Sequence, residues 1–276
     1  MDEFDHDGLH FDVTDAGPPD GEPVILLHGF PQHRGCWDRA IPHLVDAGHR
    51  VLAPDQRGYS PRARPPRRRD YRMPRLVGDV LALADGAEVG RFHVVGHDWG
   101  GAVAWALAAW HPGRLATMTS LATPHPRAMV RSLWRSDQLL RSWYMAAFQL
   151  PALPERAIGR GDRFERALVQ SGLDEADAGA YASRLRTPGA ATAALNWYRA
   201  VPGTNVRAYG PSRVPTLYLY GADDIALGPR AAALTGDHVE AVYRFETLES
   251  AGHWLPERHS GTVAERVLDH IRRSRD

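Results

Sequence analysis

The sequence GHDWGG at residues 96–101 decides the fold. An apolar run precedes it at residues 92–95, and an Ala-rich run of helical character follows it at residues 102–110. This order of strand, Gly-x-nucleophile-x-Gly and helix is typical of a nucleophile elbow, where small residues permit a sharp turn that lifts the central side chain above the sheet. The central residue is Asp98, whereas most elbows carry Ser, and no Gly-x-Ser-x-Gly occurs elsewhere.

A carboxylate at this position indicates a particular chemistry. A carboxylate that attacks a saturated carbon forms an alkyl ester on the enzyme, and activated water can then attack the carbonyl carbon of that ester. A Ser attacking the same carbon would leave an ether that resists hydrolysis. Asp98 therefore favours an epoxide or an alkyl halide as substrate. The alternative is a solvated Asp that caps a helix N-terminus.

Composition narrows the class of protein. The chain has 276 residues, 43% of them hydrophobic, which is enough for one α/β core with an insertion. The formal net charge is zero, so nothing indicates a nucleic-acid partner. Cys36 is the single cysteine, which excludes an intramolecular disulfide. We expect a cytoplasmic protein without membrane contact, because the start is acidic and no apolar run approaches the ~18 residues of a membrane span.

The first half alternates short apolar runs with helical stretches. This alternation predicts a parallel, doubly wound sheet. Residues up to Gly21 are interpreted as a first hairpin with its turn at residues 17–20. The expected strands are 23–27, 49–54, 92–95 and 115–122, and the expected helices are 37–47, 74–84 and 102–110.

The pattern changes in the second half. Residues 128–205 show helical periodicity and no strand signal, which predicts an all-helical cap inserted between core segments 1–127 and 206–276. The sheet is expected to resume at 215–220 and 242–248, before a final helix at 257–273. Residues 61–72 hold six arginines among prolines. They are interpreted as a solvated surface loop, with a funnel for an anionic substrate as the alternative.

Six motifs occur in a characteristic order. They are HGFP at 28–31, DQRGYSP at 55–61, GHDWGG at 96–101, NWYR at 196–199, YGADD at 220–224 and GHW at 252–254. Together they resemble the cap-bearing epoxide hydrolases of the α/β-hydrolase fold, and the resemblance covers nearly the whole chain. It implies a mostly parallel sheet flanked by helices, with an inserted helical cap.

The resemblance also implies a catalytic triad in the order nucleophile, acid, base. Asp98 matches the nucleophile, and His253 matches the base because it follows the last expected strand. The orienting acid follows the preceding strand, where Asp224 is in register and Asp223 is the flanking alternative. Its role would be to hold the His253 ring and to stabilise its cation. A histidine of an ordinary surface loop is the alternative for His253.

The geometry of the family assigns the oxyanion hole to the backbone N–H groups of Phe30 and Trp99. Pro31 has no N–H, which agrees with the use of the Phe30 donor. The hole would act when water attacks the Asp98 ester. His97 and His125 are expected to have structural or supporting roles.

Two tyrosines separate epoxides from halides. Opening an epoxide produces a tethered alkoxide that needs a proton donor, and a phenol suits this role. Epoxide hydrolases place two Tyr in the cap, which Tyr198 and, less closely, Tyr144 match. The alternative is that either ring is a core residue of the cap. The resemblance also implies an apolar substrate pocket made by Trp99, Phe30, Trp143, Phe148 and Trp197.

Two other functions remain open from the sequence. Haloalkane dehalogenases share the Asp elbow and often Trp99, but Phe30 replaces their common Asn, which leaves Trp143 or Trp197 as a halide donor. Fluoroacetate dehalogenases usually place Arg after the nucleophile. A non-catalytic ligand-binding protein on the same fold is the third possibility. No metal or organic cofactor is indicated, the expected ligands are a small hydrophobic epoxide and water, and the chain is expected to be a monomer or a homodimer.

Overall fold

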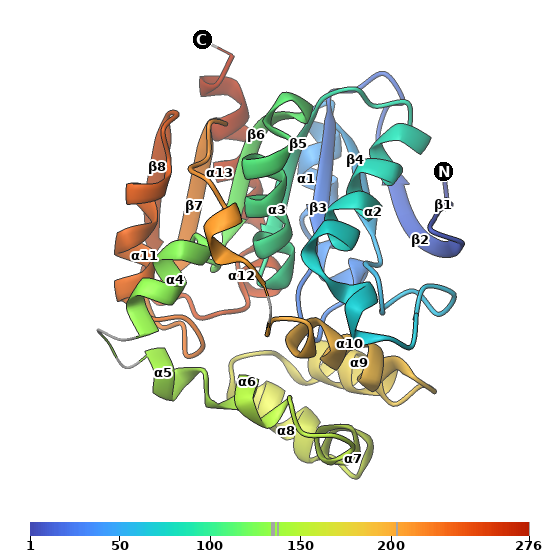
Figure 1. Cartoon of the computed structure of the whole chain (residues 1–276). Helices are drawn as coiled ribbons and strands as arrows, with labels where there is room; N and C mark the ends of the chain where they lie inside the picture. Colours follow the sequence, from blue (N-terminus) through green and yellow to red (C-terminus); the bar gives the residue numbers. More distant parts are fainter. Residues whose placement is uncertain (134–135, 137, 203, 276) are drawn as a thin grey trace.

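The computed structural model describes residues 1–133, 136, 138–202 and 204–275. Within these residues one eight-stranded sheet has the order β1-β2-β4-β3-β5-β6-β7-β8 (Figure 1). The doubly wound, mostly parallel sheet predicted from the sequence is confirmed. The strands are β1 Glu3–His6, β2 Leu9–Ala16, β3 Pro23–Leu27, β4 Arg50–Pro54, β5 Phe92–His97, β6 Leu115–Leu121, β7 Thr216–Gly221 and β8 Tyr243–Leu248.

The N-terminal hairpin differs from the prediction. β1 and β2 pair in antiparallel fashion around a two-residue turn at Asp7 and Gly8, which have φ angles of 53° and 72°. Asp-Gly is a preferred pair for such a turn because both positions need positive φ. The predicted turn at residues 17–20 instead leads from β2 towards β3, so that prediction was wrong. β2 pairs antiparallel with β4, and all later strand pairs are parallel.

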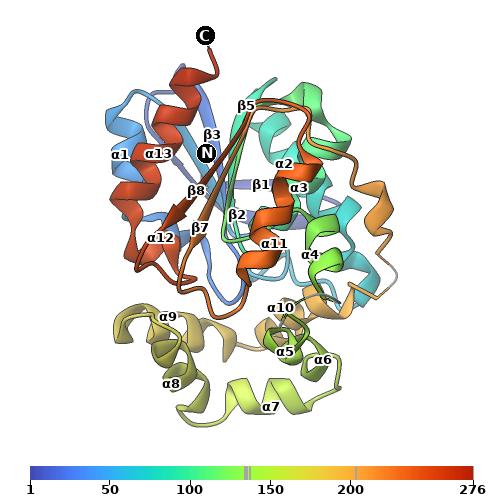
Figure 2. The ribbon, with the colours of Figure 1, turned by 90° about the vertical axis from the view of Figure 1, so that its left-hand side faces the viewer.

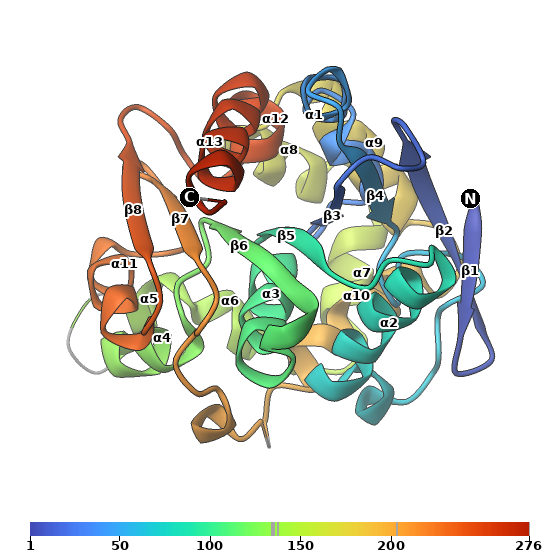
Figure 3. The same ribbon diagram turned by 90° about the horizontal axis from the view of Figure 1, so that it is seen from above.

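Helices cover both faces of the sheet, as the view from above shows (Figure 3). α1 and α13 cover one face, and α2 and α3 cover the other. The helix predicted at 37–47 is shorter, since α1 covers only its second part and a 3-10 turn at Arg34–Trp37 precedes it. The helix predicted at 257–273 is split into α12 and α13. The core helices are α1 Ile41–Asp46, α2 Met73–Gly86, α3 Trp99–Trp110, α4 Pro126–Leu133, α11 Pro229–Leu234, α12 Leu255–Arg258 and α13 Ser260–Arg273.

Between β6 and β7 the described residues form helices and no strand. α4 contacts α11 on the core, whereas the following helices form a separate layer below the sheet (Figures 1 and 2). We call this layer, residues 138–199, the cap. Its helices are α5 Gln138–Arg141, α6 Trp143–Ala147, α7 Leu153–Gly159, α8 Arg163–Gln170, α9 Glu175–Leu185 and α10 Ala190–Arg199.

The arginine-rich loop at residues 61–72 is mostly exposed. Among its arginines Arg64 alone is half-buried, and it donates hydrogen bonds to the carbonyl oxygens of Gly58 and Tyr59 on the core and of Pro188 in the cap. The loop therefore joins the two layers, and none of its arginines lines the cavity described below.

The carboxyl ends of the central strands all point towards the cap. β3, β5, β7 and β8 are followed by the HGFP, GHDWGG, YGADD and GHW motifs, respectively. The continuous apolar character of β3 and β5 reflects burial on both faces. In a doubly wound sheet, ligands bind beyond the carboxyl ends of the strands. The fold therefore gathers residues from distant segments between sheet and cap.

Candidate active site

Asp98 lies at the sharp turn between β5 and α3, with φ of 50° and ψ of −118°. Non-glycine residues rarely adopt positive φ, and such strain gathers at functional sites. The turn requires glycines on both sides. A Cβ on Gly96 would lie 2.2 Å from the carbonyl oxygen of Gly100, and a Cβ on Gly100 would lie 2.1 Å from that of Leu27. The glycines thus allow the helix to start directly above the sheet.

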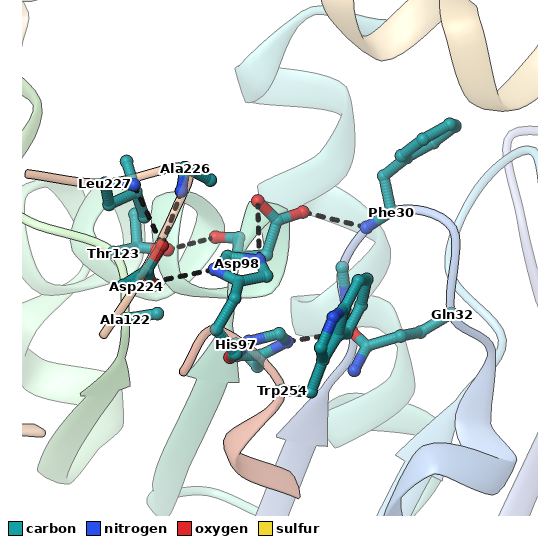
Figure 4. A network of polar contacts seen from close by, with 12 residues as sticks. Phe30, Gln32, His97, Asp98, Ala122, Thr123, Asp224, Ala226, Leu227 and Trp254 are labelled. Atoms are coloured by element: carbon teal, nitrogen blue, oxygen red, sulfur yellow. Dashed lines mark hydrogen bonds and ion pairs between the residues drawn. The ribbon is translucent and has the colours of Figure 1, made fainter. Parts of the chain in front are cut away.

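The backbone N–H groups predicted for the oxyanion hole meet the Asp98 carboxylate itself. The Phe30 N–H donates to Oδ1 of Asp98 at 2.8 Å (Figure 4). The Trp99 N–H also donates to this carboxylate. Gly29 leaves the necessary room, because a Cβ there would lie 2.4 Å from Oδ1. Backbone donors therefore hold the carboxylate, with Oδ1 on the Phe30 N–H.

His28 orients the peptide that carries the Phe30 N–H. Its Nδ1 donates to the carbonyl oxygen of Gly29 at 3.0 Å, and its Nε2 accepts from the backbone N–H of Gln56 at 3.1 Å. Only a neutral ring protonated on Nδ1 makes both bonds. Burial lowers the pKa of His28 to about 4, in agreement with a neutral ring. Sequence reasoning gave His28 no role, although its place in the HGFP motif was the available signal.

His253 follows β8 and lies between two carboxylates. Its Nδ1 donates to Oδ2 of Asp224 at 2.9 Å, and its Nε2 is 3.9 Å from Oδ2 of Asp98. Oδ1 of Asp224 accepts the backbone N–H groups of Ala226 and Leu227, so this buried carboxylate is fixed on both sides (Figure 4). Asp223, the alternative acid, is exposed.

The two carboxylates determine the protonation of His253. Burial by itself lowers the pKa of His253, but the charge and hydrogen bond of Asp224 and the charge of Asp98 outweigh it and raise this pKa to about 9. Burial also raises the pKa of Asp98. At neutral pH the resting His253 ring is therefore a cation, and it lies beside the Asp98 carboxylate.

The His253 pKa predicts a pH-dependent stability. Its ordinary value is 6.5 and its folded value is about 9, so the stabilising contribution is complete below about pH 6.5 and is lost as pH rises through about 9. The free energy of unfolding of the wild type, relative to His253→Gln, should fall across this window in urea titrations. A difference that grows with rising pH would contradict the assignment. Asp223→Asn, at an exposed position, is the control.

Tyr144 on α6 and Tyr198 on α10 line the same cavity as Asp98. Their ring centroids are 6.0 Å apart. Burial, followed by the charge of Asp98, raises the pKa of each phenol. Both tyrosines are therefore neutral hydrogen-bond donors in the site.

A cavity of about 220 Å³ extends from Asp98 between α4, the cap and the segment before β7. Its walls are mainly apolar, and its polar groups are few, which is typical of a site for a small hydrophobic molecule. The lining residues include Trp99, Ala102, Met129, Val130, Met145, Val201, Tyr209 and Leu227.

The aromatic residues predicted for this pocket divide into three groups. Trp99 lines the cavity. Phe30, Phe148 and Trp197 pack around Trp99 and Tyr198 without lining it, at ring-centroid distances such as 5.3 Å from Phe30 to Tyr198 and 5.8 Å from Trp99 to Trp197.

Trp143 does not fit the prediction, because its side chain is 69% exposed. Neighbouring positions on a helix point about 100° apart. When Tyr144 faces the cavity, Trp143 must therefore turn to the surface. The inward orientation assumed for Trp143 was wrong.

Other buried polar residues surround the site. His125 is neutral, since burial lowers its pKa to about 3, and it contacts the carbonyl oxygen of Gly210 at 3.3 Å. Sequence reasoning missed three buried residues, Gln32, Tyr181 and Glu257. Their positions in the sequence carry no recognisable pattern.

No group of three or more His, Cys, Asp or Glu in the described part of the chain is arranged to hold a metal ion. Among the same residues, no helix combines the length and the apolar character needed to cross a bilayer.

Comparison with known proteins identifies the family. A family model described as alpha/beta hydrolase fold matches residues 22–260. An AB hydrolase superfamily protein of Bacillus subtilis is 35% identical, covering 96% of this chain and 95% of that protein. Epoxide hydrolase A of Mycobacterium tuberculosis is 30% identical, covering 97% of this chain and 95% of that protein. The crystal structure of epoxide hydrolase A from Mycobacterium thermoresistibile superposes with a TM-score of 0.85 at 27% identity, covering 98% of this chain and 97% of that protein. This chain therefore belongs to the α/β-hydrolase fold family, and the resemblance to its epoxide hydrolases that the motifs indicated is confirmed.

Proposed function

We propose that this protein is an epoxide hydrolase that converts an epoxide and water into a vicinal diol through a covalent ester on Asp98. The orientation of the Asp98 carboxylate carries the proposal. Oδ1 is held by the Phe30 N–H at 2.8 Å, and Oδ2 lies 3.9 Å from Nε2 of His253. The same carboxylate lines a cavity that also holds the phenols of Tyr144 and Tyr198. A nucleophile and two proton donors thus meet in one apolar space.

In the first step, Oδ2 of Asp98 attacks an epoxide carbon. The carbon–oxygen bond of the ring breaks, and its electron pair goes to the ring oxygen. That oxygen takes a proton from Tyr144 or Tyr198, whose pKa values burial keeps above their usual range. A neutral phenol can bind the epoxide oxygen before attack and donate its proton as charge develops.

In the second step, water attacks the ester carbonyl carbon while His253 takes a proton from it. Ester formation removes the negative charge of Asp98, and this charge is one of those that raise the pKa of His253. Formation of the ester therefore lowers this pKa, so the His253 cation releases its proton, which restores the phenol that was deprotonated in the first step, and the neutral ring is then a base. The Phe30 and Trp99 N–H groups stabilise the oxyanion. The diol leaves, Asp98 is an anion again, and the proton taken from water leaves His253 as the resting cation.

The alternatives have less support. A haloalkane dehalogenase needs N–H donors for the halide, and the side chain of Trp143 is 69% exposed while the indole N–H of Trp197 already donates to the carbonyl oxygen of Arg57 at 2.8 Å. A ligand-binding protein without activity would not need the contact between Asp224 and His253 at 2.9 Å.

Isotope labelling tests the proposal directly. A single turnover with excess enzyme in H₂¹⁸O should give a diol without ¹⁸O, because its new oxygen comes from Asp98. Peptide mass analysis should then find ¹⁸O in the peptide that contains Asp98. Direct attack of water on the epoxide would instead label the diol in the first turnover, and absence of diol from a panel of aryl and aliphatic epoxides would refute the activity.

The two tyrosines should contribute jointly to ring opening. Each single Tyr→Phe change at Tyr144 or Tyr198 should slow ester formation roughly tenfold to a hundredfold, and the double change about 10³- to 10⁴-fold, because one donor partly replaces two. Rapid-mixing measurements of ester formation give these rates. Tyr71→Phe is the matched control, since the Tyr71 hydroxyl donates to the carbonyl oxygen of Pro65 at 2.9 Å, outside the cavity. An unchanged rate in Tyr144→Phe would exclude Tyr144 as a donor.

A further inference from the structure

A chain of buried polar side chains connects the cap to the core. Tyr181 on α9 donates its hydroxyl to Oε1 of Glu257 on α12 at 2.7 Å. Gln32, in the loop after β3, donates from Nε2 to the same oxygen at 2.7 Å. The exposed fractions of Tyr181, Glu257 and Gln32 are 1%, 5% and 0%. Such a network needs a partner for every polar atom, because unsatisfied groups are costly when buried.

The network continues from Gln32 to both catalytic loops. Oε1 of Gln32 accepts the Gly29 N–H at 2.8 Å and lies 2.8 Å from Nδ1 of His97. Nε2 of His97 lies 2.8 Å from the backbone carbonyl oxygen of His253 (Figure 4). His97 therefore bridges the loop of the oxyanion hole and the loop of the catalytic histidine.

Both atoms that face the His97 ring are acceptors. A backbone N–H can only donate, so the Gln32 atom that faces Gly29 must be the carbonyl oxygen. The carbonyl oxygen of His253 also can only accept. A neutral imidazole has one N–H and would leave the other nitrogen with its lone pair against an oxygen. Both contacts are hydrogen bonds only when the His97 ring carries two protons.

Glu257 is the group that can balance this charge. Burial raises the pKa of Glu257, and burial with the charge of His253 lowers the pKa of His97, so burial opposes the charged pair and the hydrogen-bond geometry around His97 is what favours it. If Glu257 carried the proton, the proton would be on Oε2, because Oε1 already accepts hydrogen bonds from Gln32 and Tyr181. There it would make no hydrogen bond, because Oε2 has no partner among the described residues. If His97 carries the proton instead, both ring nitrogens donate, one to Gln32 Oε1 and the other to the His253 carbonyl oxygen.

We propose that His97 and Glu257 share one proton through Gln32, that this proton resides on His97, and that the His97 imidazolium is a positioning group for the oxyanion loop and for His253. His97 does not line the substrate cavity, so it acts through its neighbours. Because Tyr181 belongs to the cap, the network is complete only when the cap is docked on the core.

The surrounding charges give the network a role in the second step. The ring centroids of His97 and His253 are 4.8 Å apart, so a His97 cation opposes a second positive charge on His253. This repulsion favours the basic form of His253 once Asp98 is esterified. The other titratable or charged groups that face the pair are His28 beside His97, and Asp177, Arg39 and Cys36 on the side of Glu257.

The ring protons of His97 provide the first test, which does not depend on activity. In ¹⁵N-histidine-labelled protein, both ring nitrogens of His97 should be protonated throughout the neutral pH range, with the resonances assigned by their loss in His97→Gln. Glu257→Gln keeps the shape and one acceptor but removes the charge, and should convert His97 to a ring with one proton. A single ring proton in the wild type, or two in Glu257→Gln, would overturn the proposal.

Kinetics provide the second test, which rests on the proposed function. Glu257→Gln should slow hydrolysis of the Asp98 ester roughly tenfold to a hundredfold, the effect of losing a charge-assisted buried hydrogen bond, and leave ester formation nearly unchanged. Tyr181→Phe, which removes one donor, should act in the same direction with a smaller effect, and it remains informative should Glu257→Gln fold poorly.

The control Tyr71→Phe should change neither rate. Equal slowing of both steps would indicate only loss of structure and would overturn the positioning role. If the wild type formed no diol, the proposed function would fail while the ¹⁵N result still decided the location of the proton.

Discussion

The Asp98→Ala variant should form no diol from any epoxide, with a loss in kcat of about 10⁴-fold or more, as expected when a covalent nucleophile is removed. Tyr144, Tyr198 and His253 remain in place but have no carboxylate to attack the ring. Product analysis after long incubation measures the loss. Residual diol formation at a rate within about a hundredfold of the wild type would mean that water attacks the epoxide directly.

Stability measurements separate this loss from unfolding. Asp98 holds a charge that burial disfavours, since burial raises its pKa, and it adopts a strained φ of 50°. Removing the carboxylate relieves the cost of burying a charge, and water from the cavity can reach the two freed N–H groups. The thermal midpoint of Asp98→Ala should therefore equal or exceed that of the wild type, as is common when function is exchanged for stability. A lowered midpoint would show that the carboxylate is a structural group.

The His253→Gln variant should accumulate the ester on Asp98. Attack by Asp98 does not need the His253 ring, whereas hydrolysis of the ester needs a base close to Oδ2, at the position now 3.9 Å away. Intact mass spectrometry should then show the enzyme plus the full mass of the epoxide, because ring opening keeps every substrate atom on the protein. Peptide mapping should locate the adduct on the peptide that contains Asp98.

The same variant distinguishes the two substrate classes. A haloalkane would lose its halogen and add only an alkyl fragment, so an adduct from a haloalkane and none from an epoxide would reverse the assignment. The double variant Asp98→Ala/His253→Gln is the control and should gain no mass from either compound. Failure to trap an adduct, with turnover confirmed in the wild type, would count against the covalent route or against His253 as the base.

The sequence predicted the parts of the site that depend on local geometry. Asp98 was recognisable because a strand, three glycines and a helix surround it, and the turn at φ of 50° needs those glycines. The family resemblance implied Asp224 and His253 as acid and base, at positions after the strands that are now β7 and β8. Their contact at 2.9 Å depends on parallel strands that end at the same edge, which the alternating pattern already implied.

Other parts depend on packing that no local pattern encodes. Gln32 and Glu257 meet across 225 positions of the chain, and Tyr181 reaches Glu257 from a separate layer. The orientation of Trp143 was also inaccessible, because a short helix with aromatic residues at neighbouring positions does not show which one faces inward. The hairpin at Asp7 and Gly8 was different, since Asp-Gly was a readable signal that the longer Pro-rich turn concealed.

The position of Asp98 Oδ1 against the Phe30 N–H has a consequence for the evolution of this fold. In relatives with a Ser elbow, the two backbone donors bind a carbonyl oxygen that arrives with the substrate. Here the enzyme supplies that oxygen itself, so the space where an ester or amide substrate would place its carbonyl is filled before any substrate enters.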